Sequence, residues 1–68
     1  MSAHPIMAEL RAERRARGIT QAELAKRAGY HTNAIGEFER GTRRCFDAAL
    51  FDIASALGFD LKLDRKAP

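Results

Sequence analysis

Four glycines divide this 68-residue chain into short segments, and each one follows a stretch whose apolar residues have helical spacing. These glycines are Gly18, Gly29, Gly41 and Gly58. A glycine placed after the last periodic residue favours the left-handed conformation that ends a helix. The pattern predicts four helices, over residues 6–17, 21–28, 32–40 and 46–57. The sequence therefore predicts one small all-α domain with a thin core, preceded by a frayed tail over residues 1–5.

The composition narrows the class of protein. The chain has one cysteine, so it forms no intrachain disulfide, and no apolar run approaches the ~18 residues of a membrane span. The N-terminus also lacks the apolar stretch of a signal peptide, so we expect a protein of the cytoplasm with no membrane partner. We find no nucleophile–base pair and no phosphate-binding glycine loop, and the spacing of His4, His31 and Cys45 does not suit a metal. We therefore expect neither enzyme activity nor a cofactor.

The positive charge is concentrated in the middle of the chain. Residues 11–44 contain nine Lys or Arg against four Glu, whereas the segments on either side are slightly acidic. The formal net charge of the whole chain is only +3. A basic region of this kind favours a polyanionic partner.

The second and third predicted helices are separated by a very short turn. Thr20 and Glu23 form a capping box at the start of the second helix, and Gly29 ends it. Only Tyr30 and His31 precede the third helix, which His31 is expected to cap. Two helices joined in this way form a helix-turn-helix, which directs the first turn of the second helix into the DNA major groove. An αα-hairpin in any small helical bundle shows much of the same periodicity.

The residues of this region resemble the helix-turn-helix of the Xre/Cro family of phage repressors and bacterial regulators. The stretch "TQAELAKRAGYHTNAIGEFERG" has the pattern T-Q-x-x-L-A, then A-G, then I-x-x-F-E-x-G, and "LFDIASALG" is similar to the fourth helix of that family. The resemblance implies a four-helix, lambda-repressor-like DNA-binding domain over residues 6–58. The chain departs from the family at Gly36, where a polar residue is common, at Cys45, where proline is common, and at Asp47, which replaces an apolar residue.

The resemblance also implies which residues contact double-stranded DNA. Thr32, Asn33 and Glu37 match positions that face base edges, where Thr touches a thymine methyl, Asn pairs with adenine and Glu accepts from a cytosine amino group. The expected contacts to the DNA backbone are Gln21, His31, Arg40, Arg43 and Arg44. The arginines among them should supply affinity that depends on salt but not on sequence. The alternative is an exposed helix face without a ligand, which is what we expect of Arg11, Arg15 and Arg17.

Two charged residues fall on the apolar faces of their helices. Arg14 continues the apolar stripe of the first helix, and Glu39 lies one turn after Ile35 in the third. A buried charge without a partner costs several kcal/mol, so we predict an ion pair between Arg14 and Glu39, which the family resemblance also implies. Glu37 is expected to point outward, either as a base reader or as an acid that repels wrong sequences. Gly36 is expected beside it, either allowing close approach of a DNA strand or merely tolerated at a cost of roughly 1 kcal/mol relative to alanine.

The last predicted helix has the strongest apolar stripe. The stripe runs from Phe46 to Leu57, and Phe51 lies off it. In an alternative interpretation Asp47 caps this helix and Phe46 acts as a hydrophobic staple, which moves the start by a few residues.

Residues 59–64, "FDLKLD", alternate apolar and charged side chains in the manner of a strand. A lone strand on a helical domain needs a partner for its backbone, so we expect it to pair with the same strand of a second chain, as in Xre-class antitoxins. The expected dimer contacts are Phe51, Phe59, Leu61 and Leu63. The competing interpretation of this segment is a ragged fifth helical turn, and residues 65–68 are expected to be a disordered tail.

We therefore expect a sequence-specific regulator of transcription, most simply a repressor, that binds an inverted repeat as a homodimer. Within DNA binding, the chain also fits an antitoxin with a toxin partner, a phage switch or a restriction–modification controller. From another class, it fits a protein-binding adaptor that has kept the fold without binding DNA, because Glu37 and Gly36 are unusual on a surface that faces a polyanion.

Overall fold

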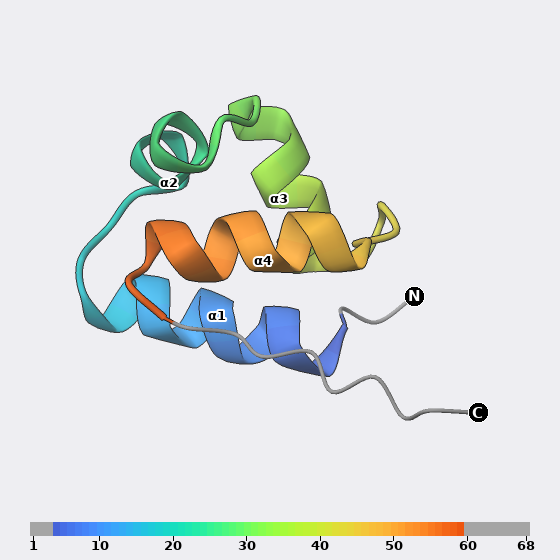
Figure 1. Ribbon diagram of the computed structural model, residues 1–68, viewed down its shortest axis with the longest axis horizontal. Helices are drawn as coiled ribbons and strands as arrows, with labels where there is room; N and C mark the ends of the chain where they lie inside the picture. Colours follow the sequence, from blue (N-terminus) through green and yellow to red (C-terminus); the bar gives the residue numbers. More distant parts are fainter. Residues whose placement is uncertain (1–3, 60–68) are drawn as a thin grey trace.

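The computed structural model describes residues 4–59, and within them the chain forms four helices and no strand (Figure 1). The helices are α1 (Pro5–Ala16), α2 (Gln21–Ala28), α3 (Thr32–Arg40) and α4 (Asp47–Ala56). The all-α fold predicted from the glycine spacing is confirmed, and each predicted helix is found to within one residue at either end.

The ends of α2 and α3 follow from local capping groups. The Thr20 hydroxyl accepts from the Glu23 N–H at 3.0 Å, which satisfies an amide that the first turn of α2 leaves free. Nδ1 of His31 accepts from the Asn33 N–H at 3.2 Å and caps α3 in the same way. Gly29 adopts the left-handed conformation with φ of 80° and ends α2. The turn between the two helices is therefore held at both sides by the residues that predicted it.

Helix α1 begins one residue earlier than the sequence predicts. Pro5 occupies its first turn, where a missing N–H does no harm, and Nδ1 of His4 accepts from the Ile6 N–H at 3.1 Å. His4 and Pro5 thus belong to the helical domain and not to the tail expected over residues 1–5.

The start of α4 differs from both interpretations of the sequence. Phe46 occupies the N-cap position without a side-chain cap, and Asp47 is the first helical residue rather than the cap. Phe46 is also 63% exposed, so it neither joins the apolar stripe nor acts as a staple. Its ring lies instead beneath the Arg44 guanidinium, with Cζ 5.4 Å from the ring centroid.

One apolar cluster joins all four helices. Figure 1 shows α1 and α4 crossing the view side by side in the same direction, with α2 and α3 above α4. The buried apolar residues are Met7, Leu10, Leu24, Ala25, Ile35, Phe38, Ala49, Leu50, Ile53, Ala54 and Leu57. They come from the predicted stripe of every helix, so the core fixes how α3 is presented on the surface.

Arg17 has a structural contact that the sequence did not predict. Its Nη1 donates to the Leu57 carbonyl at the end of α4, and its guanidinium lies 4.9 Å from the Phe59 ring centroid. Arg17 thus links the end of α1 to the end of α4 and is not simply part of a solvated face.

Several expectations fall on residues that the structure does not describe. The predicted strand lies outside residues 4–59 except for Phe59, as do Leu61, Leu63 and the expected tail over residues 65–68. Among the described residues, no helix has the length and apolar character needed to cross a membrane.

Candidate nucleic-acid interface

Tyr30 anchors the turn between α2 and α3 to the rest of the domain. The N–H groups of Gly29 and Tyr30 both donate to the Ala25 carbonyl at 2.9 Å, which closes the end of α2. The Tyr30 ring packs edge-on against Phe38 at 5.9 Å, and its hydroxyl donates to Oδ2 of Asp52 in α4 at 2.8 Å. Burial raises the pKa of the Tyr30 hydroxyl, and the hydrogen bond to Asp52 raises it further. The turn therefore has a fixed position relative to α4.

A buried charge pair fixes α3 relative to α1. Arg14 and Glu39 are 8% and 5% exposed, and Nε of Arg14 lies 2.7 Å from Oε2 of Glu39. Nη1 of Arg14 also donates to the Ile19 carbonyl at 2.7 Å. The structure thus brings together the two residues that the sequence places on inward faces, and α3 cannot rotate without breaking this pair.

Gln21 joins the same network from the start of α2. Its Nε2 donates to Oε1 of Glu39 at 3.0 Å, so its amide braces α3 from within the protein. Its Oε1 points the other way, toward Gly36. The sequence predicted a DNA contact for Gln21, and its position beside the surface of α3 is compatible with one.

A shallow hollow of about 340 Å³ lies over the outer surface of α3. We call the residues that line it the reading face: Gln21, Thr32, Asn33, Gly36, Glu37, Arg40 and Thr42. Thr32 and Asn33 are exposed at the first turn of α3, where a major-groove helix carries the side chains that contact bases. Three residues predicted to read bases and two predicted to contact the backbone therefore share one concave surface.

Glu37 does not present a free carboxylate to solvent. Its Oε1 lies 3.0 Å from Nη2 of Arg43, and the N–H groups of Thr42 and Arg43 donate to its carbonyl at 3.0 and 3.4 Å. The acid on the reading face is therefore paired with an arginine that was predicted to contact phosphate. No sequence pattern indicates this pairing, because the loop that carries Arg43 has no periodicity.

Gly36 is buried, whereas the sequence predicted it on the outer face with Thr32 and Asn33. The Arg40 guanidinium covers it: a Cβ carbon added at Gly36 would lie 3.1 Å from Nη1 of Arg40. The expectation was wrong because helical spacing places Arg40 one turn after Gly36 but does not tell where its long side chain lies.

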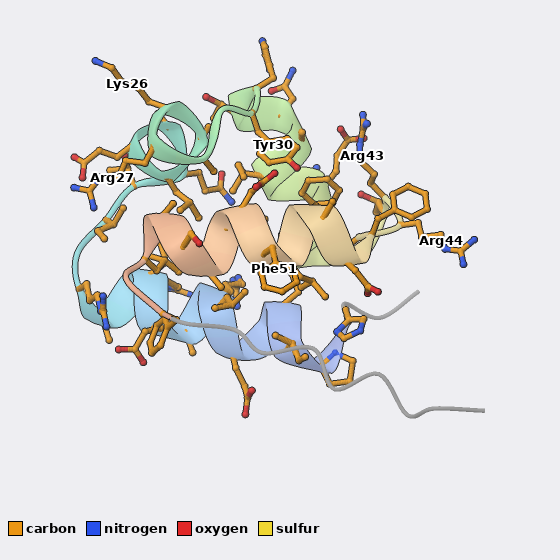
Figure 2. The ribbon with its side chains drawn as sticks, viewed as in Figure 1. Lys26, Arg27, Tyr30, Arg43, Arg44 and Phe51 are labelled. Carbon is orange, nitrogen blue, oxygen red and sulfur yellow. The ribbon has the colours of Figure 1, made fainter. Side chains whose placement is uncertain are left out.

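Further basic residues lie at both ends of the α2–α3 unit. In Figure 2, Lys26 and Arg27 project from α2 away from the core, and Arg43 and Arg44 project from the loop after α3. Arg27 pairs with Glu23 at 3.2 Å, with both side chains about half exposed. Such an exposed pair is worth ~0.5 kcal/mol at most, so it leaves the arginine available to another anion.

Within residues 4–59 the structure contains no group of three His, Cys, Asp or Glu side chains that could hold a metal ion. Cys45 is partly buried and packs against the core. Burial raises the pKa of its thiol, and the nearby Asp47 carboxylate raises it further. A thiol with a raised pKa is a poor nucleophile at neutral pH.

Comparison with known proteins gives consistent matches over this region. A helix-turn-helix domain family model matches residues 7–65. The chain is 38% identical over 61 residues to y4dL, an uncharacterized HTH-type transcriptional regulator of Sinorhizobium fredii. It is also similar to the crystal structure of the restriction-modification controller protein C.AhdI from Aeromonas hydrophila, with a TM-score of 0.75 and 31% identity.

The extent of these matches differs. The alignment with y4dL covers 90% of this chain but 31% of that regulator, so the chain spans about a third of the length of this relative. The match to C.AhdI covers 81% of this chain and 83% of the controller. Since the family model extends over most of the chain and both proteins align with the four-helix domain, the chain belongs to the helix-turn-helix family of the Xre/Cro type.

Proposed function

We propose that this chain is a sequence-specific, DNA-binding regulator of transcription that acts as a repressor and reads the major groove of an inverted repeat. The observation that carries the proposal is the reading face, where side chains of α3, including Arg40, line one hollow with Gln21 of α2. A helix braced by a buried ion pair is rigid enough to present these side chains at fixed spacing. The family match and the HTH-type regulator y4dL support the same function.

In this proposal Thr32, Asn33 and Glu37 read base edges. Thr32 and Asn33 lie at the first turn of α3, where they meet the floor of the groove first. Asn33 suits adenine, which offers one donor and one acceptor in the major groove, and Thr32 suits a thymine methyl. Glu37 is the acceptor for a cytosine amino group and lines the same hollow.

The backbone contacts come from residues that border the reading face. His31, Arg43 and Arg44 are exposed beside the two ends of α3. Their contacts with phosphate release counterions from DNA, so the affinity should fall steeply as salt is raised.

We further propose that the chain binds as a homodimer through a surface that shares no residue with the reading face. Phe51 and Phe59 are 37% and 40% exposed, and Phe59 lines a groove of about 510 Å³ with Ile6 and Leu10 of α1 and Ala54 of α4. Figure 2 shows Phe51 at the middle of α4, on the edge of that helix nearest α1 in this view. Burial of these rings and of the apolar residues of the C-terminal segment, Leu61 and Leu63, would stabilise a two-fold dimer. Two reading helices would then meet half-sites about one DNA turn apart.

A second candidate is control of a restriction–modification gene pair. It is favoured by the match to C.AhdI, which is a restriction-modification controller protein and aligns with this chain over most of its length. This role uses the same DNA-binding mechanism and differs only in the genes that the operator precedes.

The proposal is tested by titrating the protein into duplex DNA from its own upstream region and into a scrambled duplex, at about 50 and 200 mM salt. We expect the upstream duplex to bind at least ~10³-fold more tightly than the scrambled one, with an affinity that falls steeply between the two salt concentrations. Equal, weak binding to both duplexes would reject a sequence-specific regulator and favour the adaptor. Co-purification of a toxin together with site-selective binding would identify an antitoxin.

A further inference from the structure

Gly36 is not required by the backbone of α3. The glycines with positive φ are Gly18, Gly29, Gly41 and Gly58, and each lies at or just beyond the end of a helix. Gly36 lies inside α3 with helical geometry, where alanine is the better helix former. The reason for a glycine here must therefore lie in what touches it.

What touches Gly36 is the head of the Arg40 side chain. A Cβ carbon at position 36 would lie 3.1 Å from Nη1 and 3.8 Å from Cζ of Arg40, and 3.7 Å from Oε1 of Gln21. A contact of 3.1 Å is tighter than ordinary van der Waals packing, so a Cβ carbon at this position would push the guanidinium outward by a few tenths of an ångström. Gly36 acts as a seat, meaning a position without a side chain that lets Nη1 of the guanidinium approach the helix backbone.

This seat brings Arg40 from the last turn of α3 to its middle. Side chains on a helix lean toward its N-terminus and cover the turn that precedes their own Cα. Arg40 therefore covers Gly36, four residues earlier, and lines the same hollow as Asn33 and Glu37. The guanidinium therefore lies among the residues proposed to read bases, and not at the edge of the reading face where backbone contacts are expected.

The charge of Arg40 is available to a ligand. Within the part of the chain that the structure describes, no carboxylate lies within 4.0 Å of Arg40, whereas Arg14 and Arg43 each pair with a glutamate. Gln21 also keeps its carbonyl oxygen on the side of Gly36, since its Nε2 is engaged by Glu39. The fork of donors on Arg40 is thus exposed and held beside an amide.

The geometry points to Arg40 as a further base-reading residue, specific for guanine and positioned by Gly36. This inference rests on the proposed function and deepens it. Guanine presents two acceptors, O6 and N7, in the major groove, and the guanidinium fork matches both. Glu37 lines the same hollow and offers an acceptor for the amino group of the paired cytosine. The two side chains together fit a G·C base pair in each half-site.

The test compares base preferences in a library of randomised duplexes for the wild type, Arg40→Ala, Arg40→Lys and Gly36→Ala. The control is Arg15→Ala, which removes an exposed arginine of α1 that lies outside the reading face. We expect the wild type to select a G·C pair at one position of each half-site. Arg40→Ala should lose about tenfold or more of that preference. Arg40→Lys should lose less, because an ammonium also donates to guanine but lacks the planar fork, and it should keep the wild-type salt dependence because it keeps the charge.

Gly36→Ala tests the contact between Gly36 and Arg40 separately from the stability of the fold. Alanine favours the helix, and only the flexible end of Arg40 has to move, so the melting temperature should rise by roughly 4 °C. The same variant should weaken the guanine preference, though less than Arg40→Ala does, because the guanidinium is shifted and not removed. Arg15→Ala should keep the wild-type preference.

Three results would overturn the inference or its basis. A loss of affinity for all sequences alike in Arg40→Ala, with a smaller salt slope, would make Arg40 a phosphate contact. An unchanged guanine preference in Gly36→Ala would reject the seat. If the wild type itself selects no sequence, the proposed function fails and the inference fails with it. If the wild type selects a site and Arg40→Ala selects the same site, only the inference about Arg40 fails.

Discussion

The guanidinium of Arg14 in α1 donates two hydrogen bonds to the carboxylate of Glu39 in α3, at 2.7 Å from Nε and 3.0 Å from Nη2. Gln21 donates a third hydrogen bond to the same carboxylate, and Arg11 approaches it to 3.8 Å. Every oxygen of this buried acid therefore has a partner. The pair joins two helices that are far apart in the sequence, and it sets the rotation of the helix that carries the reading face.

Replacing Glu39 with alanine should destabilise the domain strongly. The substitution leaves the Arg14 guanidinium buried without its partner, which costs about 3–5 kcal/mol. That loss is comparable to the whole margin of a domain of this size, roughly 3–5 kcal/mol, so the variant should be largely unfolded at 25 °C. Urea unfolding followed by circular dichroism measures the difference.

The matched control for this prediction is Glu13→Ala. Glu13 also pairs with an arginine, Arg17, at 3.3 Å, but both side chains are more than 40% exposed. Its loss should change the free energy of unfolding by only about 0.5 kcal/mol. Equal effects of the two substitutions would show that the buried pair does not hold α3 in place.

Tyr30 should titrate at unusually high pH. Burial and the hydrogen bond to Asp52 raise the pKa of its hydroxyl above the ordinary value of 10.0. Tyr30 is the one tyrosine of the chain, so the absorbance change of tyrosinate reports this group alone. A pKa at or below 10.0 in the folded protein would contradict the contact with Asp52.

The raised pKa of Tyr30 also makes the free energy of unfolding depend on pH. The unfolded chain loses the phenolic proton at lower pH than the folded chain, so the contribution of Tyr30 is complete below pH 10.0 and is lost as pH rises through the raised pKa. Tyr30→Phe should cost about 1 kcal/mol at neutral pH and should lack this alkaline loss. Unfolding curves at about pH 8 and about pH 11 for both proteins measure the effect. An identical pH dependence in the variant would show that Tyr30 does not contribute.

Glu37→Gln should strengthen binding to DNA in general. The substitution removes a negative charge that faces a polyanion, and it frees Arg43, which now pairs with Glu37 at 3.0 Å. We expect a gain on the order of fivefold in affinity for a scrambled duplex at ~50 mM salt. Arg43→Ala is the complementary change: it should weaken all sequences alike and lower the salt slope by about 1. Weaker binding of the scrambled duplex by Glu37→Gln would contradict this account of the ion pair.

Phe51→Ser should dissociate the proposed dimer without unfolding the domain. Phe51 lies off the core stripe of α4 and is not among the residues of the buried core. The control is Phe46→Ser, which removes a more exposed ring beside Arg44. Light scattering should give monomers for Phe51→Ser and dimers for the wild type and the control. A dimer that persists in Phe51→Ser would place the interface elsewhere.

The parts of this structure that the sequence predicts well are those set by local chemistry or by helical spacing. Gly29 and Gly41 end α2 and α3 in left-handed conformations because glycine adopts them without steric cost. Arg14 and Glu39 were recognisable because an isolated charge on an apolar stripe requires a partner. In both cases the sequence pattern alone shows the physical requirement: a left-handed residue at the end of a helix, or a partner for a buried charge.

The parts that the sequence does not predict depend on long side chains that reach across helices. Periodicity places Gly36 on the outer face of α3, but Arg40 folds back over it and buries it. Arg17 reaches the end of α4 through Leu57, which no local pattern indicates. Phe46 completes the apolar stripe in sequence, yet it lies just before the first turn of α4, where the chain has not taken up the helical direction. Such contacts depend on tertiary geometry and not on spacing.

The most direct test of the central claim is to map the DNA contact on the protein by NMR. Amide shifts of isotopically labelled protein are followed as the upstream duplex, or a scrambled duplex of equal length, is added. We predict that the upstream duplex shifts the amides of Thr32, Asn33, Gly36, Glu37 and Arg40, and leaves those of Ile6, Leu10 and Ala54, which line the groove between α1 and α4, in place. Shifts confined to that groove, or no difference between the two duplexes, would contradict the assignment of α3 as the element that reads DNA.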